Sequence, residues 1–421
     1  IEDLKNRIYF LIGLMVISLV FRFFEYNLFI RLINFTNDPI VTWTFTILVS
    51  FVVKIYIYKI FFDFKIFKND KQKKKIFIFS PDIKKGGAEK NTLLLIDMFD
   101  AKKFDINLIL WKKDNDEDIN VNKIFIKKKN LKTSFISILS LIIKNNPDYI
   151  FSSLNHLNIF LGIIKIISGT KSKQIVRESN LLSLKLQDEH RNNNFLIKIR
   201  KLLTYIVYNS CNYVVCPSIE IRDDLIKNFK IKKKNLKKIQ NFKKKKTTGK
   251  KYEIKIKKDY LLAIGRLELQ KDYIFMIKAF YESLKFKDNQ LIIVGNGSEK
   301  INLKKLVKKL SLQKKIKIIK FQKNINQYLV NSKAVLMTSN YEGMPNIIIE
   351  ASYFGVKCLL TNFKGSSFFK KYKNIKILKK NLTSYAKEIT YLDSKRIKTK
   401  KFVEDFLGNK SQKKFIKCFK L

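Results

Sequence analysis

The chain has 421 residues, of which 46% are hydrophobic, so it exceeds a typical single core and at least two domains are expected. Its formal net charge of +51 favours polyanions such as anionic lipid or phosphorylated substrates. Lysine is spread along the whole chain together with abundant Ile, Asn and Phe, which is equally typical of compositional drift. Because no nucleic-acid-binding motif accompanies the charge, no nucleic-acid partner is predicted. The four cysteines form no C-x-x-C pair, and only two histidines are present, which indicates reduced thiols that pack in the interior rather than bind zinc.

Residues 1–65 contain two uncharged runs, 8–21 and 40–53, joined by a predicted turn at 34–39. Each run is shorter than the ~20 residues that a membrane-spanning helix needs, but flanking charged side chains can reach the interface and extend it. We interpret this region as an apolar helical hairpin that spans the membrane or lies in its surface; two buried core helices are the alternative. The lysines between residues 65 and 75 favour a cytoplasmic location for the chain from residue 76 onward. We therefore expect a protein of the inner membrane whose further domains face the cytoplasm.

From residue 76, short apolar runs alternate with longer helical patterns. The first series of predicted strands lies at 76–79, 106–110, 148–151, 173–176, 212–215 and within 236–242. A lysine-dense stretch then places a domain boundary at about 245–255. The second series lies at 260–265, 290–295, 315–319, 333–338 and 356–360. This alternation predicts two Rossmann-like, doubly wound α/β domains, which bind ligands at the carboxyl ends of their strands.

The most specific motif is S-N-Y-E-G-M-P-N-I-I-I-E-A-S-Y-F-G at 339–355. It places Glu342 and Gly343 in a loop after a predicted strand, and Glu350 in a helix that begins near Asn346. Glycine lets the backbone approach a ligand, and the helix N-terminus offers free N–H groups to a polarised oxygen. Two carboxylates at different depths suit a polyhydroxyl ligand, because each accepts hydrogen bonds from hydroxyl groups. The alternative is a strand–loop–helix unit with incidental acids.

A second motif, G-R-L-E-L-Q-K at 265–271, follows the first strand of the second series. The chain has nine arginines, so Arg266 at the carboxyl end of a strand is informative. Its fork of donors can bind a phosphate, and Lys271, which we expect to open the next helix, adds a point charge. Two further turns contain glycine pairs, and neither is specific alone. The paired glycines are Gly86 and Gly87, and Gly295 and Gly297.

Polar residues also follow strands of the first series. His156 comes shortly after the predicted strand 148–151, and Arg177, Glu178 and Asn180 follow or end the strand 173–176. A capping or packing role is the alternative for His156. In this order along the chain, the motifs resemble those of glycosyltransferase family four, which contains retaining enzymes with the GT-B fold and an E-x7-E signature. The resemblance covers about residues 76–395 and is denser in the second half.

The resemblance implies roles for the residues of the second half. Glu350 would hold the ribose of a nucleotide-diphosphate sugar, and Glu342 would hold its sugar together with the backbone of Gly343, Met344, Pro345 and Asn346. Arg266 and Lys271 would neutralise the leaving diphosphate. The paired glycines and Gly265 would lie near the donor, and the stretch 321–329 near its base. Ser298 replaces the proline that is usual in the family.

The family often places a histidine after the strand 148–151, in contact with the transferred sugar. Here Ser153 occupies the usual position and His156 lies three residues later, so His156 is the candidate. An acidic cluster at 114–118 is similar to the D-x-D motif that binds metal in other transferase folds, but we interpret it as a solvated turn. Family-four enzymes generally need no metal, so no metal and no cofactor other than the sugar donor are expected.

The sequence therefore predicts an α/β protein of the GT-B fold with four parts: the hairpin at 1–65, an acceptor domain at 76–248, a donor domain at 252–395, and a helix at 396–421 that crosses back to the first domain. We expect a retaining transferase that moves a hexose or N-acetylhexosamine, with a UDP-sugar favoured. The expected acceptor is a lipid-linked saccharide or surface polysaccharide, and the expected further partner is an anionic membrane surface. The alternatives are an enzyme with a soluble acceptor and a non-catalytic membrane- or polyanion-binding protein.

Overall fold

The computed structural model describes residues 73–82, 87–111, 121–128, 130–191, 193–241, 259–322, 324–398, 400–407 and 410–419. The expected hairpin at 1–65 and the acidic cluster at 114–118 lie outside these described residues. Among the described residues, no helix has both the length and the apolar character that crossing a bilayer would require.

The chain forms two compact units. One consists of Ile1–Gln72, Ile138–Asn146 and Ile163–Lys171, and its described residues are most of one helix, the end of another and the turns after them. The other unit consists of Lys73–Ser137, Pro147–Gly162 and Ser172–Leu421, and it contains both β-sheets.

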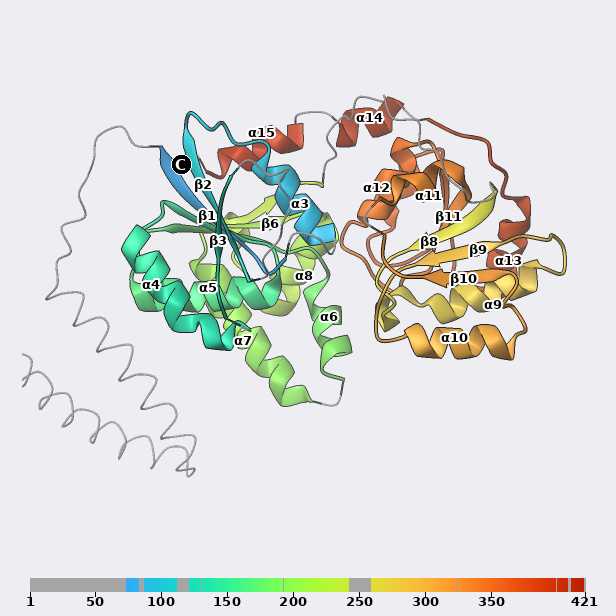
Figure 1. Cartoon of the computed structure of the whole chain (residues 1–421), viewed down its shortest axis with the longest axis horizontal. Coiled ribbons are helices and arrows are strands. Elements are labelled where there is room, and N and C mark those ends of the chain that lie inside the picture. Colours follow the sequence, from blue (N-terminus) through green and yellow to red (C-terminus); the bar gives the residue numbers. More distant parts are fainter. Residues whose placement is uncertain are drawn as a thin grey trace, which may run out of the picture. The chain divides into compact units, whose positions relative to one another are not determined.

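The first sheet has seven parallel strands in the order β3-β2-β1-β4-β5-β6-β7 (Figure 1). The strands are β1 (Lys74–Ser80), β2 (Phe104–Leu110), β3 (Asn122–Phe125), β4 (Tyr149–Ser152), β5 (Lys173–Arg177), β6 (Tyr213–Cys216) and β7 (Leu236–Lys238). The helices of this half are α3 (Gly87–Ile96), α4 (Phe135–Asn145), α5 (Asn155–Ser168), α6 (Leu182–Glu189), α7 (Asn194–Ser210) and α8 (Ile219–Phe229).

The second sheet has six parallel strands in the order β10-β9-β8-β11-β12-β13. The strands are β8 (Tyr260–Ile264), β9 (Leu291–Val294), β10 (Ile316–Ile319), β11 (Ser332–Met337), β12 (Lys357–Thr361) and β13 (Ile375–Leu378). The helices are α9 (Tyr273–Ser283), α10 (Lys300–Lys309), α11 (Asn326–Asn331), α12 (Asn346–Tyr353), α13 (Leu382–Tyr391), α14 (Lys400–Phe406) and α15 (Lys410–Lys417). Each sheet therefore has the doubly wound, Rossmann-like arrangement that the sequence predicts.

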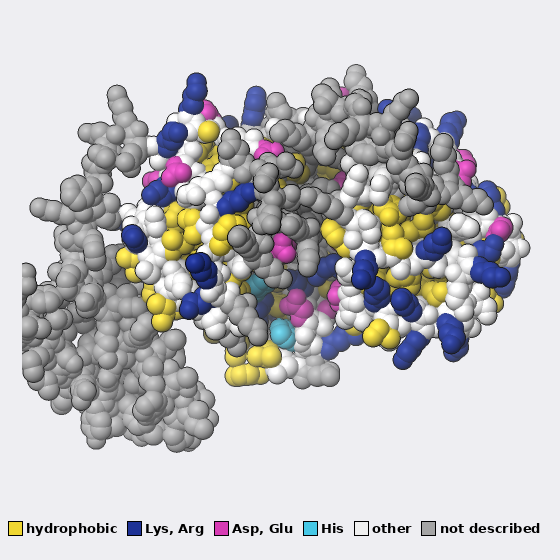
Figure 2. Space-filling view, in the orientation of Figure 1, with side chains coloured by type: hydrophobic (Ala, Val, Ile, Leu, Met, Phe, Trp, Pro, Cys, Tyr) yellow, Lys and Arg dark blue, Asp and Glu magenta, His cyan; other side chains and the backbone are white. Residues whose placement is uncertain are grey.

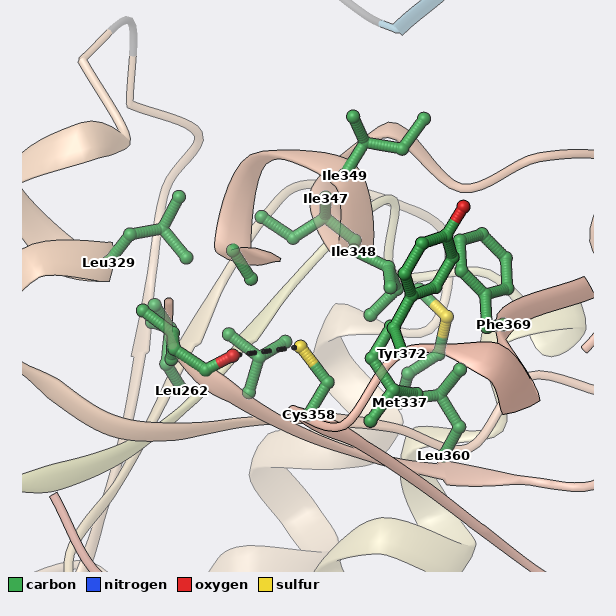
Figure 3. Packing of buried hydrophobic residues seen from close by; sticks show 14 of the residues in the cluster. Leu262, Leu329, Met337, Ile347, Ile348, Ile349, Cys358, Leu360, Phe369 and Tyr372 are labelled. Carbon is green, nitrogen blue, oxygen red and sulfur yellow. Dashed lines mark hydrogen bonds between the residues drawn. The ribbon is translucent and has the colours of Figure 1, made fainter. Parts of the chain in front are cut away.

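The strands of the second sheet are mainly apolar because both faces of the sheet are covered. On β8, Leu262 packs into the core under α11 and α12, whereas Leu261 and Ala263 pack into the core under α9, α10 and α13. Figure 1 shows α11 and α12 on one face of this sheet and α9 and α10 on the other. The first of these cores is shown in Figure 3, where Cys358 lies among aliphatic and aromatic side chains and its thiol contacts the Val356 carbonyl oxygen at 3.6 Å. This core contains three consecutive isoleucines of α12, which fixes the helix firmly on the sheet.

The C-terminal segment adds to the core of the first sheet. Phe415 of α15 and Phe419 just after it belong to the same buried cluster as Ile76 and Phe151. The ring centroids of Phe151 and Phe415 are 5.5 Å apart. The four cysteines, Cys211, Cys216, Cys358 and Cys418, are buried and form no disulfide bond, as the prediction of packing groups requires.

Candidate active site

The strand order places the candidate residues together at two points. In each sheet the order of the strands reverses once, between β1 and β4 in the first sheet and between β8 and β11 in the second. Open parallel sheets bind ligands at the carboxyl ends of the strands that flank such a reversal. Gly87 follows β1 and His156 follows β4, whereas Arg266 follows β8 and Glu342 follows β11. Gly86 lies outside the described residues.

A buried ion pair joins the two candidate loops of the second sheet. Lys271 Nζ contacts Glu342 Oε1, and the two side chains are 15% and 9% exposed. Ser339 Oγ also donates to Glu342 Oε1 at 2.8 Å, so this oxygen has two partners. An ion pair held out of water interacts more strongly than an exposed one, because the local dielectric is lower. The pair sets a positive and a negative group at a fixed place beside the end of β8.

The backbone around Lys271 differs from the prediction. Lys271 does not open a helix; it ends a single 3-10 turn, Leu269–Lys271, and α9 begins at Tyr273. Asp272 caps α9, because its side chain accepts from Phe275 N, and it adopts the left-handed conformation, which aspartate tolerates. Thr338 at the end of β11 donates to the carbonyl oxygens of Lys271 and Asp272, at 3.2 and 2.9 Å. The strand end therefore fixes the turn that carries the lysine.

Three glycines allow the candidate loops to approach one another. A Cβ on Gly265 would lie 3.0 Å from the Tyr273 hydroxyl and 3.3 Å from Lys271 Cε. A Cβ on Gly295 would lie 1.9 Å from the Gly265 carbonyl oxygen, and one on Gly297 would lie 2.2 Å from the Leu267 carbonyl oxygen. Real Cβ atoms do not approach a carbonyl oxygen as closely as the last two distances, so Gly295 and Gly297 are required for close backbone packing.

Arg266 and Glu350 differ in their surroundings. Arg266 is exposed at the end of β8, where its donors can reach a ligand. Its charge acts on Glu89 of α3. Burial raises the pKa of the Glu89 carboxyl, whereas a backbone hydrogen bond and the positive charge of Arg266 lower it. Glu350 is 5% exposed and lies in the second turn of α12. No described contact joins Glu350 directly to the Lys271–Glu342 pair.

A hydrogen-bonded relay holds the loop between β11 and α12. Asn241 Nδ2 donates to the Met344 carbonyl oxygen at 3.1 Å and to Asn346 Oδ1 at 2.7 Å. Arg177 Nη2 donates to Asn241 Oδ1 at 2.5 Å, and Asn346 Nδ2 donates to the Gly87 carbonyl oxygen at 3.0 Å. The relay therefore connects the end of β5 and the first residue of α3 with Met344 and Asn346 at the start of α12.

Arg177 is a buried cation at the start of this relay. Burial lowers its pKa to about 10, and the nearby Glu178 carboxyl acts in the opposite direction. Its Nη1 atom has no hydrogen-bond partner among the described residues. Beside it lies a small pocket, with room for about one water molecule, that is lined by Asn91, Leu95, Arg177, Val215, Ile239, Gln240, Asn241 and Phe415.

The same loop is held at two further points. Gln270 Nε2 donates to the Tyr341 carbonyl oxygen at 2.8 Å, and the Tyr341 hydroxyl donates to Asp188 of α6 at 2.7 Å. Gly343 lies so close to Ser179 that a Cβ there would be 2.4 Å from the Ser179 carbonyl oxygen. The loop that carries Glu342 is thus fixed on several sides.

His156 stands apart from the buried ion pair. It lies in the first turn of α5 and its side chain is exposed. Its pKa is lowered, first because the surrounding protein limits its access to water and second because Lys185 and Arg200 are positively charged. A histidine with a lowered pKa is neutral at pH 7 and can accept a proton or a hydrogen bond. No described contact joins it to Lys271 or Glu342.

Sequence reasoning missed Asn241, Tyr341 and Asp188 as residues that organise the site. Asn241 stands in a lysine-rich stretch with no motif around it, and its role depends on partners more than sixty residues away. The sequence indicates Glu178 as a polar residue after a strand, but it does not indicate its environment. Glu178 is buried, which raises its pKa, and it accepts a hydrogen bond from the Tyr208 hydroxyl at 2.8 Å. Among the described residues, no group of three or more His, Cys, Asp or Glu side chains is arranged to hold a metal ion.

Two parallel doubly wound sheets, with candidate residues after the strands at both reversals, define the GT-B class of glycosyltransferase folds. Solved structures of this class match most of the chain. Anabaena HepE in complex with UDP and glucose matches with a TM-score of 0.66 and 14% identity, over 82% of this chain and 99% of that one. Staphylococcus aureus TarM, in complex with fondaparinux, alpha-GlcNAc-glycerol and UDP, matches with a TM-score of 0.64 and 13% identity, over 83% and 100%.

Residues 244–407 match the family model for glycosyl transferases group 1. This match covers less than half of the chain, and most of its residues belong to the half with the second sheet. An Erwinia amylovora relative, the amylovoran biosynthesis glycosyltransferase AmsD, is 33% identical over 75 residues, 18% of this chain and 21% of its own length. The first three curated relatives match over only 21 to 22% of their own lengths.

A longer match is to a Campylobacter jejuni enzyme, the N-acetylgalactosamine-N,N'-diacetylbacillosaminyl-diphospho-undecaprenol 4-alpha-N-acetylgalactosaminyltransferase. It is 27% identical over 310 residues, 70% of this chain and 82% of that enzyme. Its name describes an acceptor saccharide that is linked to a polyprenyl diphosphate.

Proposed function

We propose that the protein is a retaining glycosyltransferase that moves a hexose or N-acetylhexosamine from a UDP-sugar to a lipid-linked saccharide. The observation that carries this proposal is the buried Lys271–Glu342 pair beside the glycine turn that ends in Arg266. The pair holds a cation for a diphosphate and a carboxylate for sugar hydroxyls side by side. The named substrates of the Campylobacter relative, and the UDP bound by two structural neighbours, support the choice of substrates.

In the proposed reaction, the bond between the anomeric carbon and the diphosphate oxygen breaks, and a bond from that carbon to an acceptor hydroxyl oxygen forms on the same face. The acceptor proton passes to the departing diphosphate, so the products are a glycoside and a nucleoside diphosphate. Arg266 and Lys271 stabilise the charge that grows on the diphosphate, which is electrostatic preorganisation. Glu342, Glu350 and the backbone from Gly343 to Asn346 position the donor.

His156 lies after the other reversal point, where we assign it to the transferred sugar. We propose that the reaction needs no metal, since Arg266 and Lys271 supply the positive charge. We also propose that the protein works at the cytoplasmic face of a membrane, because the acceptor is lipid-linked and the net charge of +51 favours anionic headgroups.

The test is transfer of labelled sugar by the purified full chain. UDP-, GDP- and ADP-sugars are each incubated with polyprenyl-diphosphate-linked saccharides or with soluble sugars, and the products are partitioned between organic solvent and water. We expect label from a UDP-sugar in the organic phase, and an α-glycoside by NMR if the donor is an α-linked UDP-sugar. Label confined to water-soluble products would overturn the lipid acceptor, and an inverted linkage would overturn the retaining mechanism.

A further inference from the structure

Helix α7 (Asn194–Ser210) has two faces of different character. Its inner face is buried at Thr204, Val207 and Tyr208. Its outer face exposes large apolar side chains: Phe195 is 70% exposed, Leu202 58% and Ile206 44%. These three residues are spaced by seven and four positions and therefore lie on one stripe of the helix. Hydrophobic side chains gather on the visible surface over α7 in Figure 2.

The charges of α7 are all positive. The sequence N-F-L-I-K-I-R-K-L-L-T-Y-I-V-Y-N-S contains no acid, and its cations are Lys198, Arg200 and Lys201. Lys198 is exposed and Lys201 half-buried. At 3.6 residues per turn both lie on the same side of the apolar stripe, Lys198 next to it and Lys201 closer to the buried face. Tyr205, 45% exposed, adds a ring with a polar tip, a residue type that favours membrane interfaces. A helix with this pattern typically lies in the plane of a bilayer surface.

We propose that the outer face of α7 docks on an anionic lipid bilayer. The apolar stripe enters the boundary between headgroups and acyl chains, and the lysines meet the lipid charges. A second copy of the chain fits this face less well, because two such surfaces would bring like charges together. The acidic lipid surface is complementary in both charge and apolar character.

The same helix contacts the first-sheet part of the candidate site. Arg200 Nη2 donates to Asn155 Oδ1 at 2.8 Å, and Asn155 precedes His156 in the first turn of α5. The Tyr208 hydroxyl, which donates to Glu178, accepts from Asn155 Nδ2 at 3.1 Å. Docking of α7 would therefore place the membrane surface next to His156 and the acceptor side of the candidate site. This inference rests on the proposed function.

The experiment places an environment-sensitive fluorophore on α7 of the full chain. The native thiols are buried, so Leu202→Cys directs the label to that position. The matched control is Ile301→Cys on α10, because Ile301 is also an exposed apolar helix residue, at 68%. The emission of each labelled protein is measured with vesicles of phosphatidylglycerol and phosphatidylcholine, and with vesicles of phosphatidylcholine alone. This readout reports on α7 itself, whether or not another segment of the chain also binds the vesicles.

We expect a blue shift and increased intensity at position 202 with the anionic vesicles, a much smaller change with phosphatidylcholine alone, and little change at position 301. No change at position 202 while the protein co-sediments with vesicles would overturn the proposal. An equal change with both vesicle types would overturn the role of the lysines. An emission change at position 202 that depends on protein concentration in the absence of vesicles would show that α7 contacts a second copy of the chain instead of a membrane.

A second pair of variants connects the surface with turnover. Leu202→Glu and Ile206→Glu together should lower transfer to a lipid-linked acceptor in vesicles about tenfold or more and leave transfer to a detergent-dispersed acceptor within about twofold. Equal loss on both acceptors would mean that the change damages the fold or the site instead. If the fluorophore at position 202 inserts into the vesicles but the protein transfers no sugar, the membrane-docking proposal stands and the proposed function falls. The failure of one proposal can therefore be distinguished from the failure of the other.

Discussion

At the scale of single residues, the candidate site rests on charges held in fixed positions. Lys271 and Glu342 form a buried pair, whereas Arg266 is exposed at the end of β8. An exposed arginine costs little to hold in the absence of ligand, and a bound diphosphate would satisfy its fork of donors. We therefore expect Arg266 to contact the leaving diphosphate directly, and Lys271 to add its charge from a position fixed by Glu342.

The first prediction concerns Arg266. Replacing it by alanine (Arg266→Ala) should lower kcat/KM by ~30-fold or more, which corresponds to a loss of about 2 kcal/mol in transition-state stabilisation. Steady-state rates of sugar transfer measure this. Arg222→Ala is the matched control, because Arg222 is an exposed arginine that pairs with its neighbour Asp223. Unchanged turnover in Arg266→Ala would refute its assigned role.

The second prediction concerns the relay through Asn241. In Asn241→Asp the side chain still accepts a hydrogen bond from Arg177, but it can no longer donate to the Met344 carbonyl oxygen or to Asn346 Oδ1. Because the loop before α12 loses this donor to two of its acceptors, the Kd for the nucleotide sugar should rise about tenfold. Calorimetric titration measures the affinity, and the unfolding midpoint should change little because the aspartate pairs with Arg177.

Asn302→Asp, at an exposed position of α10, is the control for the added charge. Unchanged donor affinity in Asn241→Asp would show that the loop before α12 keeps its shape without the relay. A fall in the unfolding midpoint with unchanged affinity would assign Asn241 to stability alone.

At the scale of elements, most strands were predictable because a strand buried on both faces is a continuous apolar run. Two strands were missed, β3 (Asn122–Phe125) and β13 (Ile375–Leu378), and both are edge strands that are short and contain a lysine. The position of α12 was predictable from the glycine and proline before it. The 3-10 turn that carries Lys271 was not, because its shape depends on hydrogen bonds from Thr338, which lies far away in the sequence.

The same contrast holds for the candidate site. The sequence motifs place Arg266 and Glu342 at strand ends, and parallel strands in one sheet bring such ends to one edge. Asn241, Tyr341 and Asp188 could not be found in this way, since their contacts join segments whose relative placement no local pattern encodes. The roles of the candidate residues in binding and catalysis stay predictions.

The third prediction concerns a buried lysine of β11. Lys333 is 7% exposed and donates to Asn289 at 3.0 Å; burial, and next the charge of Lys287, lower its pKa from 10.5 to about 8. Between these two pH values the unfolded chain binds more protons than the folded one, so this lysine makes the free energy of unfolding rise with pH.

Lys333→Met should remove this contribution. From pH 7.5 to 9.5, the urea midpoint of the native protein should therefore rise relative to that of Lys333→Met, whereas Lys317→Met, at an exposed lysine of β10, should follow the native protein. Parallel pH profiles for the native protein and Lys333→Met would contradict the lowered pKa.

At the scale of the whole molecule, positive charge is widespread: Lys and Arg side chains dot much of the visible surface of the described part (Figure 2). The field of such a protein raises the local concentration of anionic ligands and steers them to the surface, and salt weakens both effects. We therefore expect the net charge to act on association rates, and the fixed groups of the candidate site to select the ligand.

The fourth prediction concerns the contact between the C-terminal segment and the first sheet. Phe415→Ala removes a buried ring that packs against Phe99, Phe151 and Phe419, and should lower the free energy of unfolding by about 3 kcal/mol. Urea unfolding followed by far-UV circular dichroism measures the loss. Tyr391→Ala, at a residue that is 68% exposed, should have an effect below about 1 kcal/mol. Equal small effects of both changes would show that the first sheet folds without this segment.

The aromatic contacts of Phe415 and Phe419 also determine when the first sheet can be finished during synthesis. A ribosome makes β1 to β7 early, but the rings that complete their core emerge only after the whole second sheet has been translated. Until then, a nascent chain would present an apolar gap around Ile76 and Phe151, and domains generally fold as units in the order of translation. A chaperone that recognises exposed apolar surface could therefore bind the first sheet throughout the synthesis of the second sheet, until Phe415 and Phe419 emerge.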